Sequence, residues 1–285
     1  MKPQDFRFTH RLRVRWAEVD MQKIVFNAHY LMYFDTAIAD YWRALALPYE
    51  EAMQLLAGDL YVKKASIEYH QSALFDDQLA VALKCQRIGT SSITFAGAVF
   101  RGKECLVTSE LVYVFADPAT QTSRPVPAAF RDLLNAFEAG ESVLHLQVGS
   151  WPELHASATA LRTEIFVQEQ AIPADLVVDD ADPQACHVVA FNRLGQPVAT
   201  GRLLKDVNGV VRIGRMAVKK VLRGEHLGSE VLATLLQAAK SQGALKVVVH
   251  AQGSAEGFYR RRGFTLAGEA FEAAGISHIC MQKSL

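Results

Sequence analysis

The sequence lacks a net charge, a cysteine framework and any long apolar run, and each absence narrows the class of protein. Its 285 residues carry 30 Lys plus Arg and 30 Asp plus Glu, so no overall field favours nucleic acid or a membrane surface. The four cysteines are widely scattered, which excludes a dense disulfide framework and the usual metal-ligand spacings (Cys85, Cys105, Cys186 and Cys280). No apolar run reaches the roughly 18 residues of a membrane span, and the first residues lack the apolar core of a signal peptide. We expect a cytoplasmic protein with reduced thiols.

The first half of the chain has the pattern of one helix enclosed by antiparallel strands. At roughly 150 residues per domain, the length predicts two domains. Apolar residues recur every three or four positions from Asn27 to about Ala46, which predicts a long helix capped by Asn27 and ended near Pro48. Strands are expected at residues 8–16, 61–70, 78–88, 92–101 and 104–116, and a closing helix at 125–137. This order predicts an α+β domain, residues 1–142, with the sheet wrapped around the helix.

A second domain, residues 143–285, is expected because the periodic pattern lapses at Ala139–Ser142 and small polar residues take over. Helices are expected at 151–168, 227–241 and 255–261, and strands at 187–192, 198–204, 210–218, 245–252 and 278–282. An acidic loop containing proline separates the first helix from the first strand. The alternation of helices and strands predicts an α/β domain.

Asp20 and the helix start at Asn27 could form a site that cleaves a thioester. Hydrolysis needs a carboxylate or activated water at the carbonyl carbon, and hydrogen-bond donors aimed at the oxygen that becomes negative. Free amides at a helix start carry partial positive charge, and an aspartate seven residues earlier can fold back beside them if the loop is tight. By spacing alone, Asp20 could equally be a turn residue and Asn27 a simple cap.

The run Glu18–Phe34 resembles the signature of the hot-dog-fold acyl-CoA thioesterases of the 4-hydroxybenzoyl-CoA thioesterase (YbgC-like) family. The resemblance implies that Asp20 is the catalytic nucleophile or general base and that the amide at Asn27 polarises the thioester carbonyl. Glu18 stands where an aspartate is common, and Lys23 replaces a usual glycine. His29 is assigned to the helix face, since its position is often asparagine in the family. The family places its sites between subunits, so we expect a homodimer or homotetramer formed through this domain.

Arg223–Gly228 follows a predicted strand and begins a helix, where converging backbone amides can bind a pyrophosphate. Alone, it could equally be an ordinary turn between a strand and a helix. Together with Ile213–Val218 and Ala255–Phe264, however, it resembles the GNAT acyltransferase superfamily, which has a mixed sheet with flanking helices. Three further segments resemble its ElaA-like subgroup, namely Arg162–Gln170, Ala199–Leu203 and His250–Gln252.

The GNAT resemblance implies a binding mode for coenzyme A (CoA). The backbone of Met216, Ala217 and Val218 would pair with the pantetheine arm, and Tyr259 would protonate the departing thiolate. The pyrophosphate would bind the helix start, at Arg223, Gly224, Gly228 and Ser229. His226 occupies the position of the first family glycine, so its side chain could crowd the phosphates or pair with them. Tyr259 could alternatively serve core packing beside Phe258.

The amine acceptor must lose a proton, and Glu169 and His187 are the candidates for its base or for the acceptor site. We expect no metal, because His187, His226, His250 and His278 lack a ligand-type spacing. The sequence thus predicts a bifunctional enzyme that hydrolyses acyl-CoA in one half and transfers an acyl group to an amine in the other. Two alternatives stay open: the hot-dog half could be a dimerisation and acyl-CoA-sensing module, and the transferase half could bind CoA without transferring.

Overall fold

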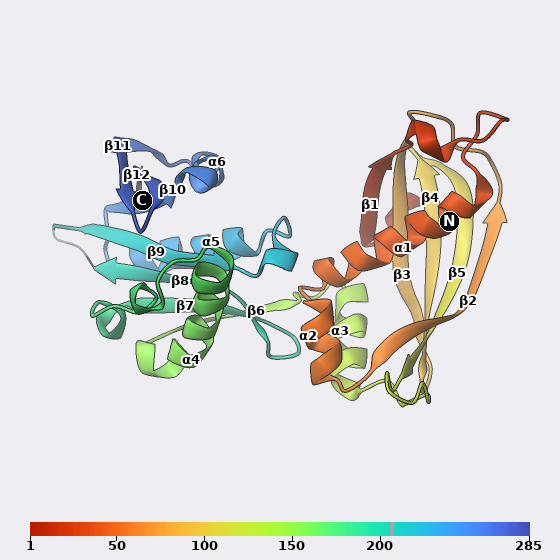
Figure 1. Ribbon diagram of the computed structural model, residues 1–285. Helices are drawn as coiled ribbons and strands as arrows, with labels where there is room; N and C mark the ends of the chain where they lie inside the picture. The colour runs from red at the N-terminus through yellow and green to blue at the C-terminus, as the bar shows by residue number, and fades with distance from the viewer. Residues whose placement is uncertain (206–207) are drawn as a thin grey trace. The chain divides into compact units, whose positions relative to one another are not determined.

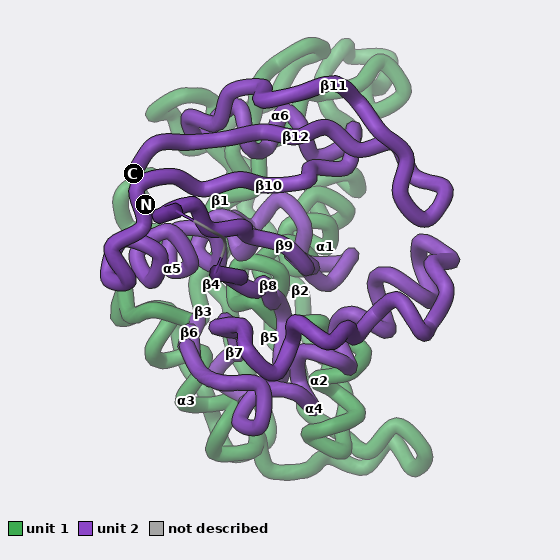
Figure 2. Tube along the Cα trace, turned by 90° about the vertical axis from the view of Figure 1, so that its left-hand side faces the viewer, with its two compact units in different colours: residues 1–143 green, residues 144–285 purple. Residues whose placement is uncertain are grey.

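A computed structural model describes residues 1–205 and 208–285, and the chain forms two compact units (Figures 1 and 2). Unit 1 spans Met1–Val143 and unit 2 spans Leu144–Leu285. The division lies one residue beyond the boundary expected from the sequence. Among the described residues, no helix combines the length and hydropathy that a membrane span requires.

Unit 1 is a five-stranded antiparallel sheet with one long helix, the hot-dog arrangement. Its strand order is β1-β3-β4-β5-β2. The strands are β1 (Phe8–Arg13), β2 (Asp59–Tyr69), β3 (Gln78–Ile88), β4 (Ser92–Arg101) and β5 (Glu104–Ala116). The helices are α1 (Asn27–Ala44), α2 (Tyr49–Leu55) and α3 (Ala128–Glu138), with short 3-10 turns at Pro3–Asp5 and Trp16–Glu18.

The core of unit 1 forms between α1 and the sheet. Seven side chains at helical spacing make the buried face of α1, namely Tyr30, Tyr33, Phe34, Ala37, Ile38, Tyr41 and Trp42. The helix approaches β4 closely at Gly97, where an added Cβ would lie 2.6 Å from the ring of Phe34. The Tyr41 ring meets Phe95 edge-on at 5.4 Å, a geometry that aromatic pairs favour. The predicted central helix is therefore the main core element of the unit.

Two details of unit 1 differ from the sequence prediction. α1 begins at Asn27 itself, with Phe26 in the cap position and no side-chain cap, so the assignment of Asn27 as N-cap was wrong by one residue. The helix ends at Ala44, and Pro48 caps the unpredicted α2. With seven residues, α2 is too short to show a clear apolar period.

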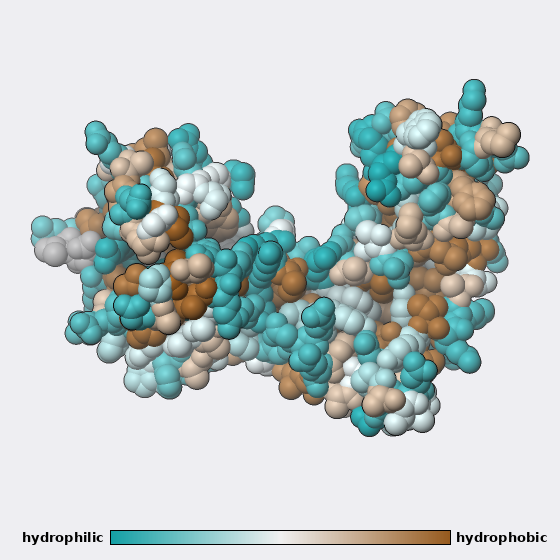
Figure 3. All heavy atoms as spheres, in the orientation of Figure 1, coloured by the Kyte–Doolittle hydropathy of each residue, from teal (hydrophilic) through white to brown (hydrophobic). Residues whose placement is uncertain are grey.

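Strand β2 forms one edge of the sheet and carries exposed apolar side chains. It is 11 residues long and pairs with β5 along one side. Tyr61, Val62 and Tyr69 on this strand are 36%, 57% and 51% exposed. In Figure 3, apolar side chains reach the surface of unit 1 over α1 and β2. A long edge with apolar groups is the kind of surface that pairs with another strand.

Unit 2 is a mixed seven-stranded sheet with helices, the GNAT arrangement, in the order β11-β12-β10-β9-β8-β7-β6. Its strands are β6 (Leu144–Gly149), β7 (Cys186–Asn192), β8 (Pro197–Lys205), β9 (Val210–Val218), β10 (Lys246–Gln252), β11 (Thr265–Ala273) and β12 (Ile276–Ser284). Its helices are α4 (Trp151–Arg162), α5 (Leu227–Ser241) and α6 (Glu256–Arg260). A π-helical turn at Thr163–Glu169 continues α4, and 3-10 turns lie at Ala174–Leu176, Asp182–Gln184, Lys220–Leu222 and Gly253–Ala255. β9 and β10 run parallel, whereas the other neighbouring strands in the described residues run antiparallel.

Strands β6 and β11 were not predicted. β11 is exposed along its whole length and rich in Ala, Gly and Glu, so it shows neither a buried alternation nor strong β propensity. The helix expected at 151–168 is α-helical only to Arg162, where the π-helical turn begins. The sequence therefore predicted the central strands of unit 2 and missed its edges.

Candidate active sites

The chain folds back tightly between Asp20 and α1. Val19 and Val25 form an antiparallel bridge, and the amide of Asp20 donates to the carbonyl of Ile24 at 2.9 Å. The amide of Lys23 donates to the carbonyl of Asp20 at 2.9 Å, which closes the turn. The carboxylate of Asp20 accepts a hydrogen bond from the amide of Gln22 at 2.8 Å. The tight loop that the thioesterase chemistry requires is therefore present.

Open amides lie at the start of α1. Within the described residues, the N–H groups of Asn27 and Ala28 donate no hydrogen bond. The amide of His29 donates to the carbonyl of Phe26 at 2.9 Å, and the Tyr69 hydroxyl donates to the carbonyl of Asn27 at 3.1 Å. Unpaired amides at a helix start, reinforced by the helix dipole, attract a developing negative charge. The turn thus brings a carboxylate and two free donors onto one loop.

Glu18 anchors this turn to the helix. Its carboxylate is buried and accepts hydrogen bonds from the Arg15 amide at 2.7 Å and from the Tyr33 hydroxyl at 2.9 Å. Burial opposes its ionisation, but these hydrogen bonds and the Arg15 guanidinium outweigh burial and hold the pKa of Glu18 below its usual value. Lys23 adopts a left-handed conformation, with φ of 63°. Glycine enters this region at no cost, which explains why glycine is usual at this position.

Strands β9 and β10 separate halfway along their length. Their parallel pairing runs from Val210 and Lys246 to Ile213 and Val249, and then stops. Just beyond, β9 has a bulge at Arg215, whose φ is 52°, and Gly201 of β8 opposes two residues there. Met216, Ala217 and Val218 lie past the bulge, where within the described residues no strand pairs with the side of β9 that faced β10, although the carbonyl of Val218 accepts a hydrogen bond from the Arg223 guanidinium at 3.3 Å. The opening leaves backbone groups free to pair with an extended ligand.

The loop after β9 turns its backbone amides outward at the start of α5. Gly224 has φ of 99°, and His226, the cap residue, has φ of 62°. In the part of the chain that the structure describes, the N–H groups of His226, Leu227 and Gly228 donate no hydrogen bond. Successive free amides at a helix start form an anion site. His226 thus takes the left-handed conformation for which glycine is favoured, and its side chain is exposed.

Arg262 adds a positive charge beside this helix start. Its guanidinium donates to the hydroxyl of Ser229 and to the carbonyl of Phe258, the latter at 2.9 Å, and lies 3.9 Å from the centre of the Phe258 ring. Gly228 lies beside Val218, since an added Cβ would be in ordinary van der Waals contact with that side chain at 3.4 Å. The sequence placed Arg262 within a run of three arginines and gave no reason to prefer it.

Tyr259 is 6% exposed and packs between two aromatic rings. Phe258 lies 5.0 Å from its ring and Phe264 lies 5.4 Å from it. Burial raises the pKa of Tyr259 to about 12. The phenol therefore stays protonated at neutral pH and can donate a proton or hydrogen bond. Both roles weighed from the sequence, packing and proton donation, remain compatible with this position.

Glu169 is ion-paired with the arginine of the phosphate loop. Arg223 donates to the two carboxylate oxygens of Glu169 at 2.6 and 2.7 Å. These hydrogen bonds, together with the charge of the guanidinium, hold the pKa of Glu169 below its usual value despite partial burial. A carboxylate with a lowered pKa and an arginine on both oxygens is a weak base. The pair connects Glu169 to the phosphate loop.

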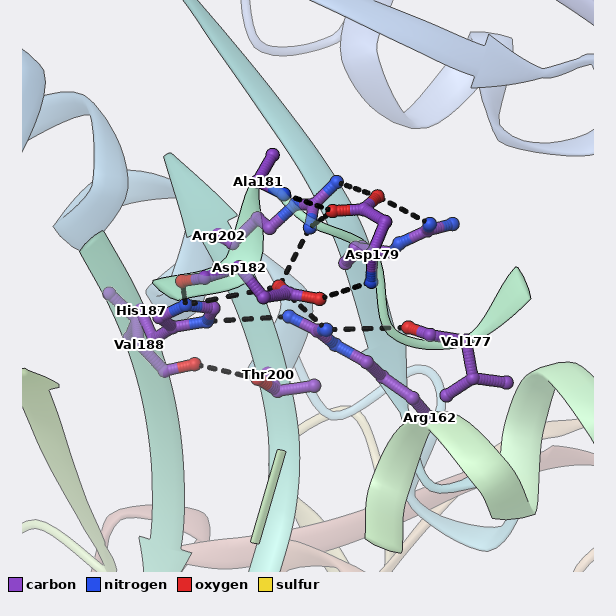
Figure 4. Close-up of polar contacts among 10 residues, drawn as sticks. Arg162, Val177, Asp179, Ala181, Asp182, His187, Val188, Thr200 and Arg202 are labelled. Carbon is purple, nitrogen blue, oxygen red and sulfur yellow. Dashed lines mark hydrogen bonds and ion pairs between the residues drawn. The ribbon is translucent and has the colours of Figure 1, made fainter. Parts of the chain in front are cut away.

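His187 is fully buried in the interior of unit 2 (Figure 4). Its Nδ1 lies 3.3 Å from a guanidinium nitrogen of Arg162, which can only donate, so Nδ1 is unprotonated. Nε2 therefore carries the proton and donates to the carbonyl of Asp182 at 2.9 Å. Burial lowers the pKa of His187 and keeps it neutral. Both ring nitrogens of His187 are engaged and its side chain is not exposed, which argues against this candidate as the base for an acceptor amine.

His250, to which the sequence assigned no catalytic role, lies on β10. It is the first residue of β10 beyond the last pairing with β9, so it lies where the strands separate. Its ring meets Phe271 edge-on at 5.1 Å, and the ring of His278 stacks on Phe271 at 5.7 Å. Burial, Arg212 and His278 lower the pKa of His250, which favours the neutral ring. It lies between buried Val249 and Ala251, and this alternation is the signal that places its side chain on the open face.

Comparison with known proteins gives a match for each unit. Residues 22–108 match the family model described as "Thioesterase superfamily", and residues 157–285 match the model described as "Acetyltransferase (GNAT) domain". Across the described residues, no group of three or more His, Cys, Asp or Glu is arranged to hold a metal ion.

Three curated relatives illustrate the two matches. "Uncharacterized N-acetyltransferase YjcF" of Bacillus subtilis is 34% identical over 125 residues, covering 43% of this chain and 87% of the relative. "Protein ElaA" of Escherichia coli is 32% identical over 149 residues, covering 47% of this chain and 96% of the relative. "Putative esterase" of Aquifex aeolicus is 30% identical over 94 residues, covering 33% of this chain and 73% of the relative. The likeness to each relative therefore covers half of this chain or less.

Proposed function

The chain belongs to the thioesterase superfamily through unit 1 and to the GNAT acetyltransferase family through unit 2, and from this premise we propose a bifunctional acyl-CoA enzyme. Unit 1 hydrolyses an acyl-CoA thioester to the free acid and CoA, and unit 2 transfers an acetyl or acyl group from CoA to an amine. The observation that carries the proposal is that each unit presents unpaired amides at a helix start beside the residues expected to do the chemistry.

In unit 1, Asp20 acts as nucleophile or general base at the thioester carbonyl. The amides of Asn27 and Ala28 are the donors for the carbonyl oxygen, because nothing in the described chain occupies them. As the carbonyl carbon becomes tetrahedral, its oxygen gains charge and these hydrogen bonds strengthen. Losing one such donor typically raises a barrier by about 3–4 kcal/mol. The carbon–sulfur bond then breaks. One water supplies the hydroxyl of the acid, either by attacking the carbonyl as Asp20 takes its proton or by opening an acyl–Asp20 anhydride, and its other proton ends on the sulfur of the departing CoA.

In unit 2, the CoA arm enters between β9 and β10. The pyrophosphate binds the amides of the loop at Gly224–Gly228, with Arg223 and Ser229 at its margins. Pantetheine pairs with the unpaired side of Met216–Val218, which follows from the missing pairing with β10. The thioester then lies near the point where the strands separate, beside the bulge at Arg215.

His250 replaces Glu169 and His187 as the proposed base of the transfer. It lies at the strand separation, its ring is favoured as neutral, and it borders the open face. His250 takes the proton from the amine, whose lone pair attacks the carbonyl carbon, and the carbon–sulfur bond breaks. Tyr259 donates a proton to the departing sulfur, since its phenol is still protonated at neutral pH. The products are an amide and free CoA.

We also propose that the chain forms a homodimer or homotetramer through unit 1. Strand β2 is a long edge with exposed apolar side chains, and exposed apolar groups continue around the Asp20 turn at Met21, Phe26 and Leu74. Pairing of β2 with its copy would satisfy the edge and cover these groups. Such an interface would also enclose the thioesterase site.

Two substitutions separate the activities. Asp20→Asn keeps an oxygen that can accept the Gln22 amide, so the turn is retained while the charged carboxylate is lost. It should abolish thiol release from acyl-CoA without amine and leave N-acylated product, measured by mass, unchanged. Tyr259→Phe should do the reverse, because it removes only the hydroxyl from the transferase unit.

The outcomes also test the alternatives. Unchanged thiol release in Asp20→Asn rejects Asp20 as the catalytic group. Acyl-CoA binding to unit 1 without turnover, over a range of chain lengths, supports a sensing module in place of a hydrolase. Normal N-acylation by Tyr259→Phe removes the tyrosine from the mechanism, and absence of any heat with acetyl-CoA rejects unit 2 as a CoA site.

A further inference from the structure

A network of charged side chains in unit 2 includes the bulge residue of β9, and most of its members are labelled in Figure 4. It joins α4, the acidic loop and strands β7, β8 and β9. Its members, the arginine–aspartate network, are Arg162, Asp179, Asp182, His187, Arg202 and Arg215. The segments that resemble the GNAT superfamily contain Arg162, Arg202 and Arg215 but not the other members of the network. A sequence motif does not say what these three side chains contact.

The buried part of the network fixes the acidic loop to the sheet. Asp182 is fully buried. One of its carboxylate oxygens lies 2.9 Å from a guanidinium nitrogen of Arg162 and 2.7 Å from one of Arg202. Its other oxygen accepts the amide of Asp179 at 3.0 Å. Each carboxylate oxygen of Asp179 accepts a hydrogen bond from one terminal nitrogen of the Arg202 guanidinium, both at 2.6 Å. Asp182 therefore ties Arg162 and Arg202 together, although the Nε atoms of both arginines are buried without a hydrogen-bond partner among the described residues.

The charges of the network do not cancel. Three guanidinium groups face two carboxylates, and His187 is neutral because its Nδ1 accepts from Arg162. The hydrogen bonds from Arg202 lower the pKa of Asp179. Burial raises the pKa of Asp182, but the Asp179 amide and the two arginines outweigh burial and lower it, so both carboxylates are ionised at neutral pH. Asp180, the next residue, is exposed and takes no part in the contacts given for the network. One positive charge is left over.

The surplus charge is most accessible at Arg215. Its side chain is 28% exposed, against 0% for Arg162 and 7% for Arg202. Among the described residues it makes one ion pair, from Nη2 to Asp179 at 2.9 Å, and no hydrogen bond from Nη1, while its Nε is buried without a partner, as are those of Arg162 and Arg202. A guanidinium presents a planar fork that fits a carboxylate. Arg215 therefore has donors left for an anion.

Arg215 also has a defined place relative to the chemistry. It is the bulge residue of β9, directly before Met216 and two residues beyond the last pairing of β9 with β10. Its side chain contacts the acidic loop, on the same face as Ala217, which packs against Phe166 and Val177. Met216 points to the other face, since its sulfur lies 2.5 Å from a Cβ built on Gly201, beside Leu235 of α5. An acceptor on the loop side would meet Arg215 at the strand separation.

We propose that Arg215 binds a carboxylate of the amine acceptor, so that unit 2 acylates amino acids or other amines that carry a carboxylate. This inference rests on the transferase function proposed above for unit 2. Asp179 does not instead attract a cationic acceptor, because both of its oxygens are taken by Arg202 and one also receives Arg215. The buried arginines hold Asp179 in place, and the surplus charge is thereby presented at the site.

The test compares amines that differ only in the carboxylate. The full chain is given acetyl-CoA and each of the twenty amino acids beside its decarboxylated amine, and N-acetylated product is measured by mass, so that thioester hydrolysis does not interfere. We expect at least one amino acid to exceed its decarboxylated partner by about tenfold or more in kcat/KM, since a charge-assisted pair is lost in the partner. Equal or better use of the decarboxylated amines would overturn the inference.

Arg215→Gln and Arg215→Lys locate the effect. The glutamine variant should lose the preference for the carboxylate, and the lysine variant should retain part of it. The Kd for acetyl-CoA, measured by calorimetry, should stay within about twofold of the unaltered chain in both variants, because CoA pairs with the backbone here. If Arg215→Gln lowered kcat/KM equally for an amino acid and for its decarboxylated amine, Arg215 would instead act on the thioester oxygen, and the proposal would be rejected.

A further measurement covers the case in which no amine reacts. Melting temperatures are then recorded with CoA and either an N-acetyl amino acid or its decarboxylated analogue. Stabilisation by the carboxylate-bearing compound alone, lost in Arg215→Gln, supports the anion site even though the transferase function has failed. Stabilisation by neither compound overturns the anion site, and failure of acetyl-CoA to bind overturns the proposed function itself.

Discussion

Arg223 and Glu169 form a two-pronged ion pair, with nitrogen–oxygen distances of 2.6 and 2.7 Å, so the arginine expected to bind the CoA pyrophosphate already holds a carboxylate. The side chains are 41% and 25% exposed, so solvent screens the pair and its net contribution to stability is small. The negative charge of Glu169 nevertheless opposes a phosphate that approaches Arg223.

We therefore predict that Glu169→Gln tightens CoA binding to unit 2 by about three- to tenfold, since a like charge is removed and the amide can still accept from Arg223. Calorimetry with CoA measures the change, and Arg223→Met, which should weaken binding, identifies the signal of unit 2. Glu272→Gln is the control, because it removes an exposed charge from β11. Weaker binding in Glu169→Gln would mean that the carboxylate instead orients the arginine.

His250→Gln should remove a proton acceptor at the strand separation. Burial, Arg212 and His278 lower the pKa of His250 from its usual value of 6.5, so the active neutral form prevails at pH 7 and is lost as the pH falls through this lowered pKa. In the unaltered chain, N-acylation should fall in acid with this ionisation. The variant should be slower by about 10²–10⁴-fold and should lose that acid limb. Tyr259, whose pKa is raised to about 12, should give no alkaline loss between pH 7 and 10.

His278→Gln is the control for the ring pair, because His278 stacks on Phe271 but lies on β12, away from β9. The His278→Gln variant should keep most of the N-acylation rate of the unaltered chain. A pH profile of His250→Gln that still shows the acid limb at an unchanged rate would eliminate His250 as the base.

The elements whose two ends carried turn signals could be predicted closely. Strands β3, β4, β5 and β9 and helix α5 have the bounds expected from the sequence. Periodicity fixes such elements, because a slip of one residue would turn the apolar face away from the core. The edges β6 and β11 lack that constraint, since β11 is exposed on both faces.

The candidate site could be predicted only where neighbouring residues make it. Asp20 and the amides of Asn27 and Ala28 belong to one short turn, which a local motif can specify. The arginine–aspartate network joins residues far apart along the chain, such as Arg162 and Arg202, whose meeting depends on sheet order. The burial of His187 could not be foreseen from the sequence, because it depends on β7 being buried on both faces, whereas β10 alternates and leaves His250 exposed.

Lys23 and His226 share a further property that the sequence only hinted at. Each stands where its family usually has glycine, and each has a left-handed φ, of 63° and 62°. The departures therefore keep the backbone of the turn and of the phosphate loop. Lysine and histidine enter this conformation at a cost of roughly 1–2 kcal/mol per residue, whereas glycine does not.

We predict that Lys23→Gly and His226→Gly change the free energy of unfolding by less than about 1 kcal/mol, because the relief of strain is offset by the greater freedom of glycine in the unfolded chain. Lys23→Val and His226→Val should each cost about 1–3 kcal/mol, since a β-branched residue fits this conformation worst. Urea unfolding at pH 7 measures all four variants. Equal stability of the glycine and valine variants would show that the backbone relaxes at these positions.

Val62→Glu should weaken the proposed assembly of unit 1. Val62 is 57% exposed on the edge strand β2, and a charge there opposes pairing of two edges. Analytical ultracentrifugation should show a shift toward monomer, and thiol release should fall with it if subunits share the thioesterase site. Leu245→Glu, which places the same charge at a 73% exposed residue of unit 2, should leave the oligomeric state unchanged. A monomer in the unaltered chain would contradict the proposed dimer directly.

Asp182→Asn should destabilise unit 2 strongly, because it leaves Arg162 and Arg202 buried with too little opposing charge. Breaking a buried pair from one side typically costs about 3–5 kcal/mol. The lowered pKa values of Asp179 and Asp182 add stability that is complete above the unfolded carboxyl pKa of about 3.9 and is lost as the pH falls below it. Hydrogen exchange in β8, followed from pH 7 to pH 3, should therefore show less acid-dependent opening in Asp182→Asn than in the unaltered chain. Asp180→Asn, at the exposed neighbour, should behave like the unaltered chain, and equal protection of β8 in the two variants would mean that the network contributes little to holding unit 2 together.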